Sequence, residues 1–125
     1  MNAKQVIVIR TDLNMRTRKI ILYGASAAMN ALVESKIKWI QTHGAPSRDP
    51  LRWLEGSDPV VLAVDSEKEL LLLYETARQH GIPCAIVTDG PSKEGTDARY
   101  TALAVGPAEN DDVDGITGHL QILRT

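Results

Sequence analysis

The stretch "PVVLAVDSEKELLLLYETARQHGIPCAIVT" (59–88) constrains the fold most, because it joins two short apolar runs through one helical pattern. Apolar runs of this length, at 59–64 and 82–88, are typical of strands that are covered on both faces of a sheet. Between the runs, Ser66 opens a Ser-x-x-Glu capping box that predicts the start of a helix, and Gly81 predicts its end. A strand, a helix and a second strand in succession predict a right-handed crossover between parallel strands.

Two further strands are expected outside this unit, at 4–11 ("KQVIVIRT") and 99–106. A long helix is expected after the first of them, with Asn14 as its N-cap and Gly44 at its end, because apolar residues recur about once a turn. A short helix is expected over 49–56, and an acidic helical turn and an apolar tail end the chain. Only about ten residues separate the third and fourth strands, too few for a usual crossover helix, so the fourth strand should run antiparallel to the third.

These elements predict one α/β domain over residues 1–125, with four main strands and helices on both faces of the sheet. A chain of 125 residues with 43% hydrophobic content can bury one ordinary core and has no room for a second domain.

Cysteine content and hydropathy bound the setting in which the chain works. Its one cysteine, Cys84, lies in an apolar run and has no partner for an internal disulfide, which favours a reducing, intracellular setting. No cationic or histidine neighbour in sequence would activate this thiol, so we expect a buried structural residue and not a nucleophile. No run reaches the roughly 18 to 20 apolar residues of a membrane span, and the start of the chain lacks the apolar core of a signal peptide. A cytoplasmic protein is therefore expected.

The formal net charge of −2 conceals two halves of opposite sign. Residues 1–52 contain nine Lys and Arg against three Asp and Glu, a net +6, whereas residues 53–125 contain five against thirteen, a net −8. Cations gathered in the first half favour an anionic partner such as tRNA or phosphate. Accidental clustering on a solvated surface explains the same charges, since a domain that coats nucleic acid usually has a pI well above the 5.9 of this chain.

Three of these cations, Arg16, Arg18 and Lys19, stand at the start of the expected long helix. Cations at that end oppose the helix macrodipole, so helix stability does not explain them. An anion docked there would gain the free backbone N–H groups and all three side chains. Solubilising surface charge is the alternative explanation.

Carboxylates follow three of the expected strands, at the edge where α/β proteins usually bind ligands. Asp65 precedes the capping box and Asp12 suits a turn, so both have structural explanations. Asp89 instead heads a Gly/Pro/Ser-rich loop, which makes it the stronger candidate. The three histidines show no metal-ligand spacing, no phosphate-binding loop or nucleophile elbow occurs, and Ser26 lies mid-helix without a base nearby in sequence. Neither a metal nor a cofactor is expected.

From Lys4 to Leu123 the chain resembles the type 2 peptidyl-tRNA hydrolases of archaea and eukaryotes. The resemblance rests on "KQVIVIRTDLNM", on a lysine that opens an alanine-rich helix, and on "VDSEKELLLLYETARQHGIP", "TDG" and "TALAVGPAENDDVDGITGHLQIL". It implies a three-layer α/β/α sandwich around a four-stranded mixed sheet whose last strand is antiparallel. It also implies hydrolysis of the ester between a peptide and the 3′ end of tRNA.

The site that the resemblance implies is matched in part. Lys19 occupies the position of the family's helix-opening lysine and Asp89 that of its aspartate after the third strand, and both belong to the family's catalytic cluster. We expect these two side chains to lie within a few ångströms of each other at the carboxyl edge of the sheet. One and two turns into the helix, Tyr23 and Ser26 stand where the family usually has glutamine and histidine.

In the loop after the third strand, the family pattern is Asp-Ala-Gly-Arg-Thr-Gln, followed by Gly-Thr before the fourth strand. This chain has Asp-Gly-Pro-Ser-Lys-Glu at the first place and Ala-Arg at the second. Lys93 and Arg99 thus replace both loop threonines, which removes two hydroxyls and leaves anion binding intact or stronger. In an enzyme, Asp89 would orient or deprotonate the attacking water and Lys19 would stabilise the developing oxyanion. Lys93 or Arg99 would replace the missing donors.

Three functions remain open at this point. The first is a peptidyl-tRNA hydrolase in which the cations of the helix start and of the loop converge on one surface and bind tRNA. The second is a noncatalytic relative that binds tRNA or another anionic ligand. The third is a small α/β interaction protein that acts as a homodimer through an apolar helix face carrying Trp39 or Trp53.

Overall fold

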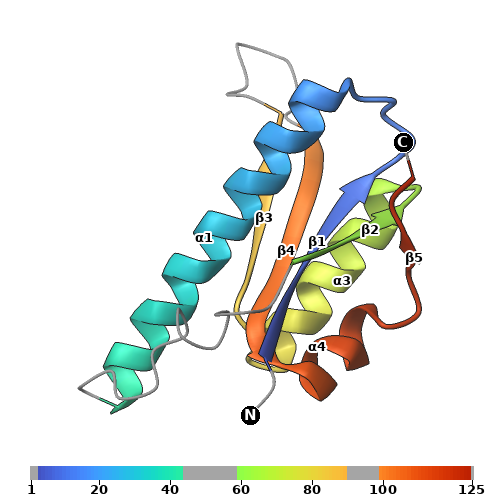
Figure 1. Cartoon of the computed structure of the whole chain (residues 1–125). Coiled ribbons are helices and arrows are strands. Elements are labelled where there is room, and N and C mark those ends of the chain that lie inside the picture. Colours follow the sequence, from blue (N-terminus) through green and yellow to red (C-terminus); the bar gives the residue numbers. More distant parts are fainter. Residues whose placement is uncertain (1–2, 44–58, 90–98, 125) are drawn as a thin grey trace.

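The computed structural model of the chain describes residues 3–43, 59–89 and 99–124, which form one five-stranded mixed sheet and three helices (Figure 1). The strands are β1 (Ala3–Arg10), β2 (Val60–Val64), β3 (Cys84–Thr88), β4 (Tyr100–Glu109) and β5 (Gln121–Ile122). The helices are α1 (Thr17–His43), α3 (Glu67–Gln79) and α4 (Asn110–Thr117).

The strands of the sheet follow the order β3-β4-β1-β2-β5, with β1 in the centre. β1 pairs parallel with β2, from Val6 opposite Val60 to Arg10 opposite Val64. β4 pairs antiparallel with both β1 and β3, so the direction expected for this strand is confirmed. Because β4 is antiparallel to both neighbours, β1, β2 and β3 run in the same direction and end at one edge of the sheet.

Side chains from one face of the strands pack against α3 and α4. Val8 and Leu103 are buried there together with Leu70 of α3 and Val113 of α4. Successive side chains of a strand point to opposite faces, so their neighbours along the chain form a separate cluster on the other face. In Figure 1, α3 and α4 accordingly lie to the right of the sheet and α1 to the left.

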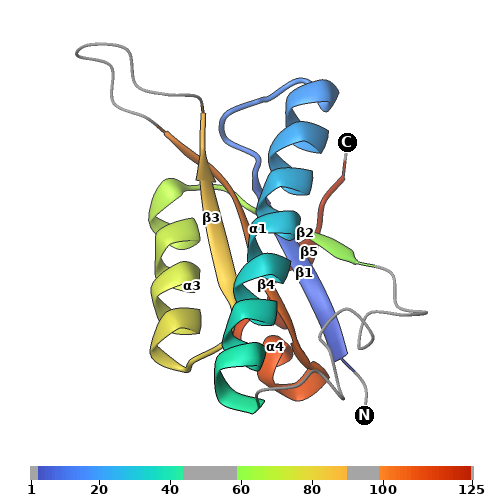
Figure 2. The same cartoon turned by 90° about the vertical axis from the view of Figure 1, so that its left-hand side faces the viewer.

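Small residues let α1 approach this second face closely (Figure 2). Ala27 and Ala31 are 0% exposed and belong to the same cluster as Ile9. At Gly24, a Cβ atom would already lie 3.4 Å from Ile7 Cγ2. Close packing on the sheet therefore explains the alanine-rich start of the helix.

The two ends of α3 follow from the capping residues that the sequence predicts. The side-chain oxygen of Ser66, the N-cap, accepts a hydrogen bond from the backbone N–H of Glu69 at 3.1 Å. At the other end, Gly81 has a φ of 70° and the backbone N–H of Ile82 donates to the Ala77 carbonyl at 2.9 Å, which is a Schellman motif. Glycine suits this position because a Cβ atom is unfavourable at positive φ.

Two details of the prediction are wrong. The sheet has a fifth strand, Gln121–Ile122, which pairs antiparallel with β2; two residues carry no periodic pattern that could reveal a strand. α1 begins at Thr17 and not directly after Asn14, which has a φ of 50° in the preceding turn. Asparagine tolerates this left-handed conformation, so the turn uses the residue expected to cap the helix. The helix expected over 49–56 lies outside the described residues.

Two features on which the expected cellular compartment rested, Cys84 and the hydropathy of the helices, can be examined in the structure. Cys84 is 1% exposed, and burial raises the pKa of its thiol to about 11, which suits the structural role expected for it. Within the ranges that the structure describes, no helix has the length and apolar character needed to cross a membrane.

Leu70 and Leu72 lie on the same helix but are 0% and 62% exposed. We expect Leu70→Ala to lower the free energy of unfolding by about 2 to 5 kcal/mol, because it deletes buried contacts and leaves a cavity. Leu72→Ala should change it by less than about 0.5 kcal/mol. Urea unfolding followed by circular dichroism measures both values, and equal effects would contradict the packing of α3.

Candidate functional site

The carboxyl ends of β1 and β3 lie at the edge of the sheet where α1 begins (Figure 2). β2 runs in the same direction, so the carboxylates that follow the three strands belong to one edge, as the sequence predicts. Asp12 is paired with Arg10, and Asp65 is exposed beside the N-cap of α3. Asp89 is the carboxylate that side chains of α1 reach.

Asp89 forms a cluster with Lys19, Tyr23 and Arg99. Tyr23 Oη donates a hydrogen bond to Asp89 Oδ1 at 2.5 Å, and Arg99 Nη2 donates one to Oδ2 at 2.8 Å. Lys19 Nζ lies 4.0 Å from Oδ1. The backbone N–H of Asp89 donates to the Arg99 carbonyl at 2.8 Å, which holds the end of β3 beside the start of β4.

These contacts keep Asp89 ionised. The hydrogen bond from Tyr23, followed by that from Arg99, holds the pKa of the Asp89 carboxyl below its usual value, and the Lys19 charge adds to the effect against an opposing contribution from burial. The same hydrogen bond, together with burial, raises the pKa of Tyr23. The cluster therefore contains a carboxylate and a neutral phenol beside the side chains of Lys19 and Arg99.

The spacing of Lys19 and Tyr23 explains why one helix supplies two members of the cluster. Residues four apart lie on the same face of a helix, and this face of α1 passes the end of β3. Ser26 lies about one turn further along α1, partly exposed, and is not among the hydrogen-bond partners described for Asp89.

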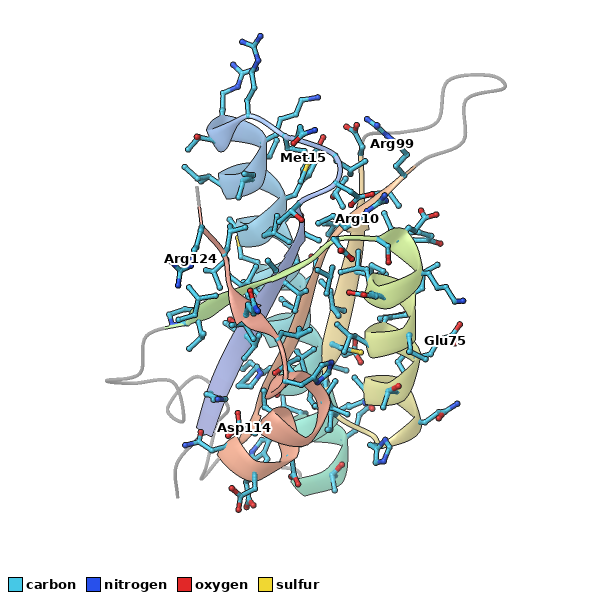
Figure 3. All side chains as sticks on the ribbon, turned by 90° about the vertical axis from the view of Figure 1, so that its right-hand side faces the viewer. Arg10, Met15, Glu75, Arg99, Asp114 and Arg124 are labelled. Atoms are coloured by element: carbon cyan, nitrogen blue, oxygen red, sulfur yellow. The ribbon has the colours of Figure 1, made fainter. Side chains whose placement is uncertain are left out.

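Two of the remaining sequence-predicted cations, Arg16 and Arg18, lie at the same end of the molecule. Arg16 and Arg18 are exposed where α1 begins, and the Arg16 carbonyl accepts the first helical hydrogen bond, from the N–H of Ile20 at 3.1 Å. Figure 3 shows Arg99 and the start of α1 at this end. Lys93 lies outside the described residues.

A buried arginine organises this edge, and it is absent from the residues that the sequence singled out. Arg10, 8% exposed, donates from Nε and Nη2 to both carboxylate oxygens of Asp12, at 3.0 and 2.6 Å. Its Nη1 donates to the Tyr100 carbonyl at 2.9 Å and lies 3.7 Å from Glu67 Oε1. An arginine at the end of an apolar strand, with an aspartate two residues later, was the available signal.

The structure adds detail to two expectations about the cluster. Lys19 and Asp89 lie within a few ångströms of each other, as expected, with 4.0 Å between Nζ and Oδ1, and the hydrogen bonds to Asp89 come from Tyr23 and Arg99. Tyr23 was considered as a substituted position, whereas it is a direct partner of Asp89. Its spacing of four residues from Lys19 could have revealed this.

A hollow lies where α1 begins, and none of the four cluster residues lines it. A cavity of about 260 Å³ separates the start of α1 from the end of β1 and the C-terminal tail. Its lining includes apolar and polar side chains, among them Ile9, Asn14, Met15, Ile20, Leu123 and Arg124. Among the residues described, no group of three or more His, Cys, Asp and Glu side chains is arranged to hold a metal ion.

Removing the Tyr23 hydroxyl should raise the pKa of Asp89 toward its usual value, because that hydrogen bond favours the charged form. ¹³C NMR titration of the Asp89 carboxyl carbon in wild type and Tyr23→Phe measures the shift. Tyr74→Phe, a phenol on α3, should leave it unchanged. A wild-type pKa at or above the usual value would contradict the described hydrogen bond.

Because the folded pKa is lowered, Asp89 stabilises the fold above its unfolded pKa, and this stabilisation disappears as the pH falls through the folded value.

Comparison with known proteins shows the family of the chain. Residues 3–123 match the model of the family described as peptidyl-tRNA hydrolase PTH2. A peptidyl-tRNA hydrolase of Methanocaldococcus jannaschii is 39% identical over 121 residues, which cover 96% of this chain and 99% of that protein. The peptidyl-tRNA hydrolases of Methanopyrus kandleri and Halobacterium salinarum are each 36% identical, covering 97% and 95% of this chain and 98% of each relative. The chain therefore belongs to the PTH2 family of peptidyl-tRNA hydrolases.

Proposed function

We propose that this chain is a peptidyl-tRNA hydrolase that cleaves the ester between a peptide and the 3′ end of tRNA. The observation that carries the proposal is an ionised Asp89 held beside Lys19 and Arg99 at the carboxyl edge of the sheet. A family match over residues 3–123 supports the same reaction. Ester hydrolysis needs a group that directs water and a positive charge near the developing oxyanion, and this cluster contains both.

Asp89 directs the attacking water in the proposed reaction. A carboxylate whose pKa is lowered accepts a proton weakly, so we assign Asp89 to orient the water and to take its proton only as the C–O bond forms. The oxyanion of the tetrahedral intermediate develops near the Lys19 ammonium. When the ester C–O bond breaks, the proton passes from Asp89 to the 3′ oxygen of the tRNA and the peptide leaves with a carboxyl group.

Tyr23 and Arg99 position Asp89 in this scheme. Each binds one carboxylate oxygen, which fixes the plane of the carboxyl group against rotation. Arg99 thereby supplies a donor where the family has a threonine, and Tyr23 supplies one where the family has a glutamine. Lys93 is proposed to add positive charge near the substrate, and Ser26 leaves its position without the family's histidine.

The exposed cations at the start of α1 are proposed to bind tRNA phosphates. Arg16 and Arg18 extend the positive charge of Lys19 and Arg99 along this end of the molecule. Phosphate oxygens there also meet free N–H groups of the first turn of α1.

One observation favours a second candidate, a relative that binds tRNA without cleaving it. Both oxygens of Asp89 already accept hydrogen bonds from protein side chains, and this occupancy competes with a water molecule.

Other parts of the sequence prediction also stay predictions: a single domain over 1–125, the three-layer sandwich, a cytoplasmic location and a homodimer.

Asp89→Asn preserves the shape of the side chain and removes its charge. If Asp89 directs the water, the rate of peptidyl-tRNA hydrolysis should fall by about 10² to 10⁴ while tRNA affinity changes little. Asp65→Asn alters an exposed carboxylate that follows β2 and is the matched control, with a rate close to wild type. Single-turnover kinetics measure both. A wild-type protein that binds tRNA but does not exceed the uncatalysed rate would move the binding protein to first place.

Binding of tRNA should weaken steeply with salt, because neutralised phosphates release counterions. Arg18→Ala should reduce the slope of log affinity against log salt by about one. Arg78→Ala, which removes an exposed arginine of α3, should leave the slope unchanged. Fluorescence anisotropy with labelled tRNA gives these slopes, and an affinity independent of salt would remove tRNA from the partners of this end.

A further inference from the structure

A second cavity lies at the amino edge of the sheet, opposite the edge that carries Asp89. Its volume is about 370 Å³, and its walls come from the end of α1, from the residues between α3 and β3, and from the junction of β4 with α4. In Figure 1 these segments lie at the lower end of the molecule, whereas α1 begins at the upper end. The cavity is here called the Trp39 cavity, and none of the four residues of the Asp89 cluster lines it.

One tryptophan and two prolines give the Trp39 cavity an apolar wall. Pro107 is fully buried and lies at the floor, whereas Trp39 and Pro83 are partly buried. A volume above about 300 Å³ and a largely apolar lining with a few polar groups are typical of ligand pockets. Trp53, which the sequence prediction names together with Trp39, lies outside the described residues.

Two carboxylates lie at the mouth of the Trp39 cavity. Glu109 and Asp112 are exposed, and neither forms an ion pair with another described residue. Lys38 is the one cation among the described lining residues, and its Nζ already lies 3.7 Å from Glu34 Oε1. The mouth of the cavity therefore attracts a positively charged group.

Ser35 contributes a buried hydroxyl to the same lining. This residue is 5% exposed, yet its side chain has no hydrogen-bond partner among the residues that the structure describes. Buried polar groups are normally paired, because an unmatched one has lost its water without gaining a protein partner. A ligand that carries N–H donors would supply the partner that Ser35 lacks.

These features together select one kind of ligand. The carboxylates repel an anion, and a wholly apolar group would leave both carboxylates and the Ser35 hydroxyl unmatched. Arginine combines an apolar stem with a planar cation that stacks on an indole ring, and its five N–H donors match carboxylate oxygens. Lysine has the charge and the stem but lacks the planar group.

We propose that the Trp39 cavity binds an arginine side chain of a basic peptide. The guanidinium group stacks on Trp39 and donates hydrogen bonds to Glu109 and Asp112, and the Ser35 hydroxyl accepts one as well. The proposal does not depend on the hydrolase reaction, because the cavity and Asp89 lie at opposite edges of the sheet.

Calorimetric titration with the peptide acetyl-Gly-Arg-Gly-amide tests the binding. We expect a Kd on the order of 0.1 to 1 mM. The same peptide with citrulline in place of arginine should bind at least about tenfold more weakly, because citrulline keeps the shape of the side chain and loses the charge. Equal affinity for the two peptides, or no binding of the arginine peptide at about 10 mM, would overturn the proposal.

Charge variants test the location of the site. Glu109→Gln combined with Asp112→Asn should raise the Kd of the arginine peptide by about three- to tenfold and leave the rate of peptidyl-tRNA hydrolysis unchanged. Glu75→Gln combined with Asp111→Asn alters two exposed carboxylates outside the lining and is the matched control, with wild-type affinity.

Nuclear magnetic resonance locates the peptide independently of these variants. In ¹H–¹⁵N spectra, the indole N–H resonance of Trp39, assigned with a Trp53→Phe variant, should shift as the arginine peptide is added. An unshifted Trp39 resonance would overturn the proposal, and so would a Kd that the Glu109 and Asp112 substitutions leave unchanged.

Discussion

A buried guanidinium group at the end of β1 is the interaction on which the carboxyl edge of the sheet depends. Burying an arginine is unfavourable unless its donors are matched, and Arg10 meets this requirement with partners from three segments. Through Asp12, Arg10 holds the turn that leads into α1. Through the Tyr100 carbonyl it holds the start of β4, and through Glu67 the first turn of α3. Arg99 is the neighbour of Tyr100, so the cation that binds Asp89 is located indirectly by Arg10.

At the same edge of the sheet, neighbouring side chains keep Asp89 ionised, and two of these neighbours are the cations Lys19 and Arg99. Asp12 and Asp89 both have pKa values lowered mainly by hydrogen bonds, but the two carboxylates have different partners. Both carboxylate oxygens of Asp12 accept hydrogen bonds from Arg10, and this contact has a structural role. Asp89 shares its oxygens between Tyr23 of α1 and Arg99, the residue before β4, and its side chain remains partly exposed.

One helix serves several purposes, and this explains its unusual composition. The inner face of α1 includes Gly24, Ala27 and Ala31, whose small size lets the helix approach the sheet. Its first turns place Lys19 and Tyr23 beside Asp89. Large apolar side chains, among them Met29 and Val33, are exposed on its outer face. Because apolar residues occupy two opposite faces, the helix lacks the single polar face of an ordinary surface helix.

The sequence by itself determined where the long strands lie along the chain, that β4 runs antiparallel to β3, the ends of α3 and the edge that carries Asp89, because these depend on local patterns: apolar runs, Ser66, Gly81 and loop length. It also brought Lys19 and Asp89 together through a family resemblance. Tertiary structure decided the two-residue strand β5, the burial of Arg10, and the partnership of Tyr23 with Asp89. Each of these joins residues distant along the chain. The local signals, an aspartate two residues after Arg10 and a spacing of four residues between Lys19 and Tyr23, do not identify the distant partner, because that partner is brought close only when the sheet forms.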